Sequence, residues 1–389
     1  MPSFRAALEA ELTALSAAHR LRALPGAVGA SRVTVQVAGQ PRLSFSSNDY
    51  LALASHPDLI AAAQQTAARD GFGASAARLI SGDLPAHREL ERALASFLGY
   101  PSALLFPSGY QTNIGVLTAL AGPDDVIVSD ALNHASIIDG CRLSRARTAV
   151  YPHGDLDGAA RLLRQSASAR RRLLVTESLF SMDGDAAPLA SLAGLAAKND
   201  AILIVDEAHA LGVLGPSGRG LCAAAGVVPD VLIGTLGKAL GAAGGFVAAD
   251  PLIIATLVNR ARTFIFTTAL PPPVAGAAQA ALRLLAGPEG DRRRAVLHEL
   301  SAALAAGLPA LSPSGPPAVA GPIHPFIVGT DARALAVSAR LAGRGLFVPA
   351  IRPPTVPEGR ARLRITLSAA HSPSDVDRLL VALREATAE

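Results

Sequence analysis

The sequence predicts an α/β protein in which a large, mainly parallel sheet domain precedes a smaller α+β domain. From about residue 100 to 250, seven short apolar runs alternate with helical stretches. Such runs are typical of strands that crossover helices bury on both faces. A proline triplet at 271–273 then interrupts the chain, and the strand-like runs beyond it are fewer. We therefore expect an N-terminal helical segment (1–45), a large domain (46–275) and a small C-terminal α+β domain (276–389).

The expected elements follow in order along the chain. An amphipathic helix over 4–18 places Phe4, Leu8, Leu12 and Leu15 on one face, which should pack on a larger body. The strands of the large sheet are expected at 103–106, 126–129, 148–151, 173–177, 202–206, 231–234 and 244–248. The small domain should contain strands at 324–328, 346–350 and 362–367, with helices near 332–343 and 374–386. A ligand is expected outside the carboxyl ends of the parallel strands.

Composition narrows the range of functions. Half of the 389 residues are apolar, and neither a membrane-spanning run nor a secretory leader is evident, so a cytoplasmic protein without membrane contact is expected. The net charge of +4 and the lack of tryptophan argue against nucleic-acid binding. Cys141 and Cys222 are too few for a disulfide framework or a zinc site. Of 35 Lys and Arg residues, just Lys198 and Lys238 are lysines, so few amines are available for covalent chemistry.

The tetrapeptide DEAH at 206–209 raises the possibility of a nucleotide-hydrolysing motor. That function needs a G-x-x-x-x-G-K-[ST] loop upstream, whereas the sole Gly-Lys pair, at 237–238, lies downstream. GFGASA at 71–76 fits a loose dinucleotide-binding pattern, but it follows a helical stretch instead of a strand, so we interpret it as a turn. Asp206 and His209 could in principle share a metal ion, although an H-E-x-x-H motif is missing.

Asp206 and Lys238 together indicate a different chemistry. Each is expected just beyond a strand end, and one crossover of a parallel sheet could bring both to the same pocket. The lysine could form a Schiff base there, and the carboxylate could hold the protonated ring nitrogen of pyridoxal phosphate. The segment 106–120 offers a helix whose first amides, at Gly109 and Tyr110, could receive the phosphate. Taken singly, Lys238 could be a surface lysine, and Asp206 a helix cap or a structural ion pair.

Several motifs, in order and at matching spacings, resemble those of the α-oxoamine synthases, pyridoxal-phosphate enzymes that condense an amino acid with an acyl thioester and release carbon dioxide. They are SSNDYLAL (46–53), FPSGYQTN (106–113), NHAS (133–136), TESLFSMDGD (176–185), DEAHALGVLG (206–215), TLGKALG (235–241) and IRPPTVPEG (351–359). The resemblance spans nearly the whole chain and implies the type I pyridoxal-phosphate-dependent transferase fold. IRPPTVP further resembles the biotin-pathway member that joins L-alanine to a pimeloyl thioester of coenzyme A or acyl carrier protein. A glycine-using relative is the alternative.

The resemblance also implies roles for individual residues. Lys238 would carry the cofactor, Asp206 would pair with the ring nitrogen, and His134 would stack on the ring, although His134 could also be a helix-capping residue. His209 and Ser181 would form hydrogen bonds to the phenolic oxygen of the cofactor or to nearby polar atoms. The phosphate would be bound by Gly109, Tyr110 and Thr235, although Thr235 could also have an ordinary role in a turn. Asn48 and Arg352 would receive the substrate carboxylate, and Arg22 and Thr355 would contact the substrates. No metal ion is implied.

The family forms its active site at a homodimer interface, so a homodimer is expected. Thr267 or Thr268, in FIFTTALPP (264–272), would reach the phosphate of the neighbouring subunit. The family usually has glycine where this chain has Ala52 and Ala210. If the backbone requires positive φ at either position, alanine costs about 1 kcal/mol, which changes local geometry without removing a catalytic group.

Overall fold

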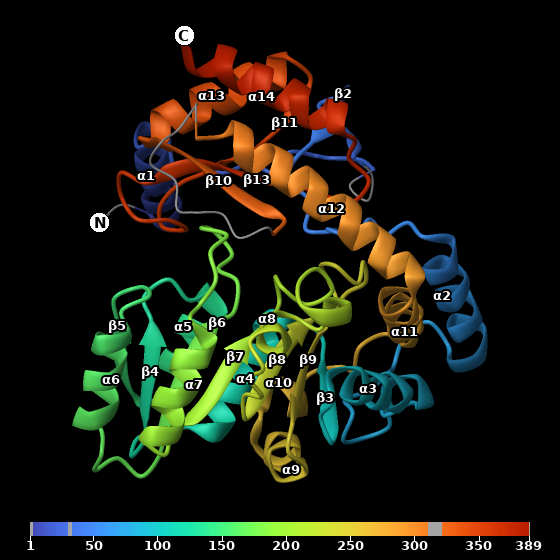
Figure 1. Cartoon of the computed structure of the whole chain (residues 1–389), viewed down its shortest axis with the longest axis vertical. Coiled ribbons are helices and arrows are strands. Elements are labelled where there is room, and N and C mark those ends of the chain that lie inside the picture. Colours follow the sequence, from blue (N-terminus) through green and yellow to red (C-terminus); the bar gives the residue numbers. More distant parts are fainter. Residues whose placement is uncertain (1–2, 30–32, 310–320, 389) are drawn as a thin grey trace. The chain divides into compact units, whose positions relative to one another are not determined.

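The computed structural model describes residues 3–29, 33–309 and 321–388 (Figure 1). The chain forms two compact units. The larger comprises Asp49–Ser181 and Asp185–Ala295, and the smaller comprises Met1–Asn48, Met182–Gly184 and Val296–Glu389.

The units differ from the expected domains in two respects. Helix α11 (Pro272–Ala286), which begins at the proline triplet close to the expected boundary at 275/276, packs against α2 (Pro57–Asp70) and α3 (Pro85–Leu98) of the larger unit. The change of unit therefore comes about 20 residues later, at Ala295. The first 48 residues do not stand alone, because they group with the C-terminal part of the chain.

The larger unit is built on a seven-stranded sheet in the order β3-β9-β8-β7-β6-β4-β5. Strands β5, β4, β6, β7 and β8 run parallel to one another, and β9 is antiparallel to both β8 and β3. All seven predicted strands are confirmed, with bounds β3 Ser102–Phe106, β4 Val126–Asp130, β5 Arg147–Tyr151, β6 Arg172–Glu177, β7 Ile202–Asp206, β8 Val231–Thr235 and β9 Gly245–Ala249.

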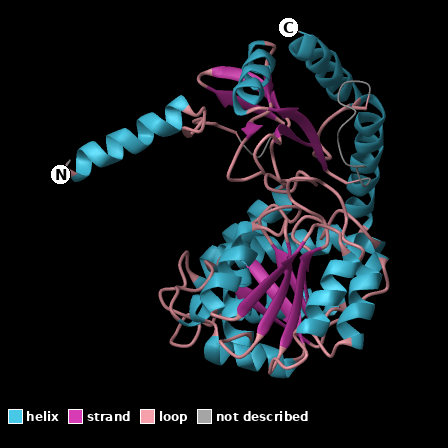
Figure 2. Cartoon of the chain, turned by 90° about the vertical axis from the view of Figure 1, so that its left-hand side faces the viewer, coloured by secondary structure: helices cyan, strands magenta, loops and turns pink. Residues whose placement is uncertain are grey.

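Helices cover both faces of this sheet, as Figure 2 shows. Successive side chains of a strand point to opposite faces, and both faces are apolar here: Ile204 belongs to one core cluster, whereas Leu203 and Val205 belong to the other. This explains why the strands are continuous apolar runs. The remaining helices of the unit are α4 Gly109–Leu120, α5 Ala135–Ser144, α6 Leu156–Gln165, α7 Leu189–Lys198, the 3-10 turn η1 Pro216–Gly218, α8 Leu221–Ala224, α9 Pro251–Arg260 and α10 Arg262–Ile265.

Within its described residues, the smaller unit contains two three-stranded sheets. One has the order β1-β2-β11 (Thr34–Val37, Gln40–Ser44, Leu346–Phe347), and the other β10-β13-β12 (Ile323–Gly329, Ala361–Thr366, Ala350–Ile351). The predicted strand over 346–350 is thus two short strands, because the chain passes there from one sheet to the other. The helices α13 (Asp331–Gly343) and α14 (Pro373–Ala388) form as predicted, and α12 (Pro288–Gly307) spans the change of unit.

The predicted N-terminal helix forms as α1 (Phe4–Ala17), with Ser3 as its N-cap. None of its residues is buried, and Phe4 of its apolar face is 81% exposed. The expected packing of this face is therefore not found within the described part of one chain.

Two turns bear on the sequence analysis. Gly71 ends α2 with a φ of 84°, so GFGASA follows a helix and is the turn that was predicted. Ala52 has a φ of 54°, a left-handed conformation in which a Cβ costs about 1 kcal/mol. Ala210, in contrast, is not among the described residues with positive φ, so its methyl group causes no such strain.

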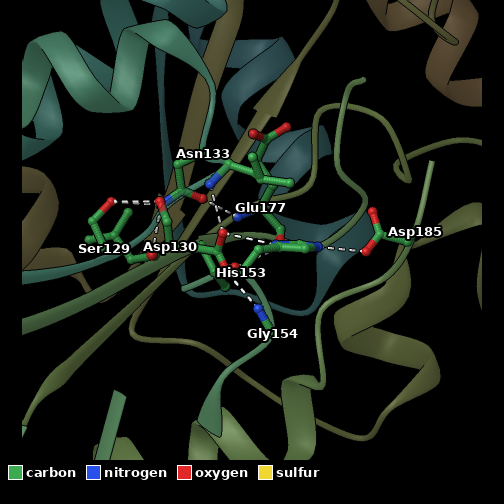
Figure 3. A network of polar contacts seen from close by, with 10 residues as sticks. Ser129, Asp130, Asn133, His153, Gly154, Glu177 and Asp185 are labelled. Carbon is green, nitrogen blue, oxygen red and sulfur yellow. Dashed lines mark hydrogen bonds and ion pairs between the residues drawn. The ribbon is translucent and has the colours of Figure 1, made fainter. Parts of the chain in front are cut away.

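A buried charge network lies at the carboxyl ends of β4 and β5 (Figure 3). The Nδ1 atom of His153 lies 2.9 Å from Asp130 Oδ1, and its Nε2 atom lies 2.7 Å from Asp185 Oδ2. The His153 ring also packs edge-on against Phe180, with 4.4 Å between the ring centroids. Hydrogen bonds to the two carboxylates raise the pKa of His153 to about 10, so the ring is cationic at neutral pH.

We expect the substitution His153→Ala to lower the free energy of unfolding at neutral pH by about 2 kcal/mol, because two largely buried carboxylates lose their cation. A histidine whose folded-state pKa is raised stabilises fully below its unfolded pKa of 6.5, and this stabilisation is lost as pH rises through about 10. Urea unfolding of the wild type and of His153→Ala, at neutral pH and above pH 10, measures the difference in the free energy of unfolding at each pH. An equal difference at both pH values would assign the loss to packing against Phe180.

Candidate active site

A cavity opens at the carboxyl ends of β6, β7 and β8, within the larger unit. Asp206 and Lys238 both line it, as the crossover argument predicts. The other lining residues are Gly109, Tyr110, Asn113, His134, Ser136, Glu177, Ala208, His209, Ile233, Gly234 and Thr235. Seven of the residues proposed for the cofactor thus gather around one cavity.

Asp206 is the last residue of β7 and is 6% exposed. Its Oδ2 accepts a hydrogen bond from Asn113 Nδ2 at 2.8 Å, and its Oδ1 accepts one from the backbone N–H of Ala208 at 2.9 Å. These two hydrogen bonds fix the direction of the carboxylate. Asn113, which the sequence analysis did not single out, therefore orients this group from α4.

Lys238 is linked to two further side chains. Its Nζ lies 2.8 Å from His209 Nε2, and His209 Nδ1 lies 2.7 Å from the hydroxyl of the fully buried Tyr50. An ammonium group has only donors, so a protonated Lys238 donates to Nε2 and leaves the ring proton on Nδ1, facing Tyr50. His209 can thereby pass a change in the protonation of the amine on to a buried hydroxyl.

His134 serves as the N-cap of α5 and lines the cavity at the same time. Its Nδ1 accepts from the backbone N–H of Ser136 at 3.2 Å and lies 2.8 Å from the Ser136 hydroxyl, which in turn accepts from Asn113 Nδ2 at 2.9 Å. Helix capping and a role in the cavity were weighed as alternatives, but the structure is compatible with both. The hydrogen bond at the cap fixes the orientation of the ring. Because Nδ1 is the acceptor in this bond, the proton of the neutral imidazole is on Nε2.

The first turn of α4 forms one wall of the cavity. Ser108 caps this helix, and the amides of Gly109 and Tyr110 have no carbonyl partner within the helix, so they can bind an anion. A Cβ on Gly245 would lie 2.7 Å from backbone atoms of Gly109, so the glycine allows β9 to approach the helix start. The Thr235 hydroxyl donates to Gly244 O at 3.0 Å and accepts from the N–H of Gly237, which matches its alternative role in a turn.

Glu177 is a further polar lining residue, after Asn113, to which the sequence analysis gave no role. It ends β6 and lies opposite Asp206 in the register of β6 and β7. Its carboxyl group is almost fully buried, and its Oε1 has no hydrogen-bond partner. Burial, together with the charge of Asp206, raises the pKa of Glu177 to about 8, against an opposing effect of Lys238.

The residues proposed for substrate binding belong to the smaller unit. Arg22 donates to Pro353 O at 3.1 Å, Arg352 donates to His19 O, and the N–H of Thr355 donates to Arg352 O at 3.1 Å. Burial and the charge of Arg22 lower the pKa of Arg352. The structure thus brings Arg22, Arg352 and Thr355 into one basic cluster.

Asn48 is placed beside another arginine. Its Oδ1 accepts from Arg364 Nη1 at 3.2 Å, and Arg364 is a largely buried residue of β13. In the sequence, the available signal for Arg364 was an arginine inside the strand-like apolar run RLRITL. Asn48 and Arg352 were expected to act together, whereas the guanidinium that contacts Asn48 is that of Arg364.

Three predicted residues lie on loops. Ser181 is buried at the end of the segment Asp49–Ser181, just before the chain passes into the smaller unit at Met182. Asp183 in this crossing segment is 2.7 Å from Arg362 Nη1. Thr267 and Thr268 follow α10, next to Phe266, whose side chain is 70% exposed.

Known proteins are similar to this chain in both sequence and fold. The model of the class I and II aminotransferase family matches residues 41–383. A protein of Anaeromyxobacter dehalogenans named 8-amino-7-oxononanoate synthase is 53% identical over 96% of this chain and 94% of that protein. A protein of the same name from Bordetella petrii is 50% identical over 97% of this chain and 96% of that protein. The chain belongs to the 8-amino-7-oxononanoate synthase family.

Solved structures agree with this membership. Serine palmitoyltransferase from S. paucimobilis, determined with bound pyridoxal phosphate and myriocin, superposes with a TM-score of 0.91 at 30% identity, covering 98% of this chain and 97% of that chain. An 8-amino-7-oxononanoate synthase from Francisella tularensis superposes with a TM-score of 0.78 at 28% identity, covering 89% of this chain and 98% of that chain. The fold is the type I pyridoxal-phosphate-dependent transferase fold, as predicted.

The cavity fits the cofactor of this enzyme family, pyridoxal phosphate. It offers an amine, a carboxylate fixed by two donors, an imidazole held by a helix cap and a helix start for an anion. Asn113 Oδ1 and Glu177 Oε1 are buried without hydrogen-bond partners, as expected of polar atoms around a ligand site. Among the described residues, no helix is long and apolar enough to cross a membrane, and no group of three or more His, Cys, Asp or Glu side chains is placed to hold a metal ion.

Proposed function

We propose that this protein catalyses the decarboxylative condensation of L-alanine with a pimeloyl thioester in biotin biosynthesis. The products are 8-amino-7-oxononanoate, carbon dioxide and the free thiol carrier, which is coenzyme A or acyl carrier protein. The names of the relatives that are 50 to 53% identical support this reaction. The observation that carries the proposal is that Lys238 and Asp206, which lie 32 residues apart in sequence, line one cavity with the start of α4.

Pyridoxal phosphate, when bound, supplies the electron sink for cleavage of bonds at the amino-acid α-carbon. We assign its covalent attachment to Lys238 and its ring nitrogen to Asp206, whose carboxylate is oriented by Asn113 and Ala208. His134 provides the flat face against the ring. His209 and Ser181 would bind the phenolic oxygen, and the amides of Gly109 and Tyr110, with Thr235, would bind the phosphate. Of these residues, Ser181 is not among those that line the cavity.

Lys238 also acts as the proton carrier at the α-carbon. Its amine is 2.8 Å from His209 Nε2, which keeps the amine within reach of a partner that accepts or returns a proton. The hydroxyl of Tyr50 at the other ring nitrogen fixes the orientation of His209. A fixed orientation of the base is required, because the reacting bond and the amine must be aligned for transfer.

We assign the alanine carboxylate to Asn48 together with Arg364, because a guanidinium fork suits a carboxylate and these two side chains are in contact. Arg22, Arg352 and Thr355 are then available for the acyl thioester. Their cluster carries two guanidinium groups, which favours an anionic carrier.

This assignment predicts a difference between two arginine substitutions. Arg364→Ala is expected to raise the KM for alanine by about 10²-fold, since the loss of a charged, bidentate partner costs about 3 kcal/mol. Arg352→Ala is expected to raise chiefly the KM for the acyl donor. Steady-state kinetics with each substrate varied in turn measures both effects. If Arg352→Ala instead raises the KM for alanine and Arg364→Ala raises that for the acyl donor, Arg352 is the residue that binds the alanine carboxylate.

We further propose that the enzyme is a cytoplasmic homodimer. The exposed apolar face of α1 and the exposed Phe266 beside Thr267 and Thr268 support an interface with a second copy. Thioesters of coenzyme A and acyl carrier protein are substrates of the cytoplasm, which supports the location.

The reaction is tested by incubating the loaded enzyme with pimeloyl-coenzyme A or pimeloyl-acyl carrier protein and either alanine or glycine. The proposal expects 8-amino-7-oxononanoate, identified by mass, and release of one carbon dioxide per turnover with alanine. Preferential turnover of glycine would contradict this proposal and show that the protein is a glycine-using synthase.

A further inference from the structure

The carboxyl group of Glu177 has no part in the reaction as assigned so far. It lines the cavity between the residues that hold the cofactor, and its Oε1 is buried without a partner. Its backbone is fixed, because the N–H of Glu177 donates to Asn133 Oδ1 at 3.1 Å (Figure 3). Asn133 Nδ2 donates to Ser129 Oγ and Val175 O, both at 2.9 Å, so Glu177 cannot move away from the cavity without breaking this network.

The charges around Glu177 come from several elements. Asp206 faces it from β7, Lys238 follows β8, and His134 and Tyr110 belong to the starts of α5 and α4. His209 lines the same cavity. The backbone N–H groups of His134 and Ser181 favour the charged form of Glu177, but burial and Asp206 oppose it more strongly and raise the pKa of Glu177.

The two carboxyl groups of the cavity differ in how well a negative charge on each is balanced. Asp206 has two donors on its oxygens and would have a cationic partner in the ring nitrogen of the bound cofactor, whereas Glu177, opposite Asp206 in the sheet register, has one buried oxygen without a partner. Pyridoxal phosphate brings further negative charge through its phosphate. An ionised Glu177 would therefore add a further negative charge to a poorly solvated site beside an anionic ligand, and the N–H groups of His134 and Ser181 compensate that charge only in part.

We propose that Glu177 is a positioning residue that must be uncharged for the cofactor to bind, so that loss of its proton to the solvent weakens cofactor binding. The inference rests on the proposed site of the cofactor in this cavity. It assigns the two carboxyl groups at the ends of β6 and β7 opposite states: Asp206 charged, Glu177 neutral. Ionisation breaks the O–H bond of Glu177 and transfers its proton to the buffer, with no other reactant.

The test is the dissociation constant of pyridoxal phosphate as a function of pH, measured by equilibrium dialysis of the full chain. A group that titrates near pH 8 is about one-tenth protonated at pH 9, so the wild-type dissociation constant should rise about tenfold between pH 7 and pH 9 beyond any change in Glu177→Gln. Glutamine is neutral and of the same size, so E177Q should keep the neutral-pH affinity.

A matched control is Glu207→Gln. Glu207 is also fully buried beside β7, but its oxygens accept from Ser178 Oγ at 2.7 Å and from the N–H groups of Leu221 and Cys222, and it does not line the cavity. Loss of this carboxylate should lower the melting temperature and leave the wild-type pH dependence of cofactor affinity in place. If E177Q fails to fold, Glu177→Met serves as a second neutral variant.

Two outcomes are distinguishable. Borohydride reduction followed by peptide mass analysis should find the cofactor on Lys238 in wild type and E177Q. If it is found there but the two proteins show parallel pH profiles, or if E177Q loses affinity at neutral pH, the role given to Glu177 is wrong. If no cofactor is found on Lys238, the proposed function itself fails.

Discussion

Lys238→Ala is expected to abolish covalent attachment of the cofactor and to lower kcat/KM by at least about 10³-fold, because one side chain is assigned both the attachment and the proton transfer. Lys238 is the one lysine that lines the cavity, and the chain has just one other, Lys198. No second amine among the lining residues can replace it. The loss of the Lys238–His209 contact should leave the fold intact, since this pair faces the cavity.

Lys198→Ala is the matched control for this prediction. It removes the same charge and side chain from the exposed end of α7, away from the cavity, and should leave attachment and turnover unchanged. Borohydride reduction with peptide mass analysis locates the attached cofactor, and steady-state assays give kcat/KM. Retention of more than about one-tenth of the activity by Lys238→Ala would show that another group performs the proton transfer.

The sequence predicts the large sheet well, because each of its strands is buried on both faces. Runs such as ILIVD need apolar residues at every position, and this signal is stronger than the alternation of a half-exposed strand. The packing of α11 on α2 and α3 depends on contacts distant in sequence, so the pattern around residues 275/276 does not indicate it. The apolar face of α1 predicts a helix, but it says nothing of the partner, which the described part of the chain does not supply.

The residues of the candidate site also divide into those that the sequence predicts and those that depend on contacts distant in sequence. Asp206 and Lys238 could be placed because each follows a strand end, where parallel topology brings residues together. Glu177 also ends an apolar strand, in LLVTE, and its position was the available signal. Its significance depends on the register that sets it opposite Asp206, which the sequence does not encode locally.

Asn113 and Tyr50 were beyond local prediction for a similar reason. Asn113 reaches Asp206 across 93 residues of sequence, and Tyr50 reaches His209 across 159. An asparagine on a helix and a buried tyrosine are ordinary residues until folding brings them to a functional partner. Their roles in orienting the carboxylate and the imidazole therefore come from the structure.

The second large effect is expected for Asp206→Ala, with a fall in kcat/KM of about 10²- to 10⁴-fold. Without the carboxylate, the ring nitrogen loses the partner that keeps its proton, and the cofactor becomes a poorer electron sink. The substitution also leaves Asn113 Nδ2 and the N–H of Ala208 without their acceptor, so the melting temperature must be measured beside the kinetics.

A cofactor analogue with a methylated ring nitrogen separates these two consequences of Asp206→Ala. Its ring carries a permanent positive charge, and the smaller alanine leaves space for the methyl group. The analogue should restore part of the activity of Asp206→Ala and inhibit the wild type, where the methyl group would meet the carboxylate. Asn113→Ala, which removes one hydrogen bond and keeps the charge, should lose less activity than Asp206→Ala. If the analogue gives no rescue in a folded, cofactor-loaded Asp206→Ala protein, the role of Asp206 is structural and the ring nitrogen is held elsewhere.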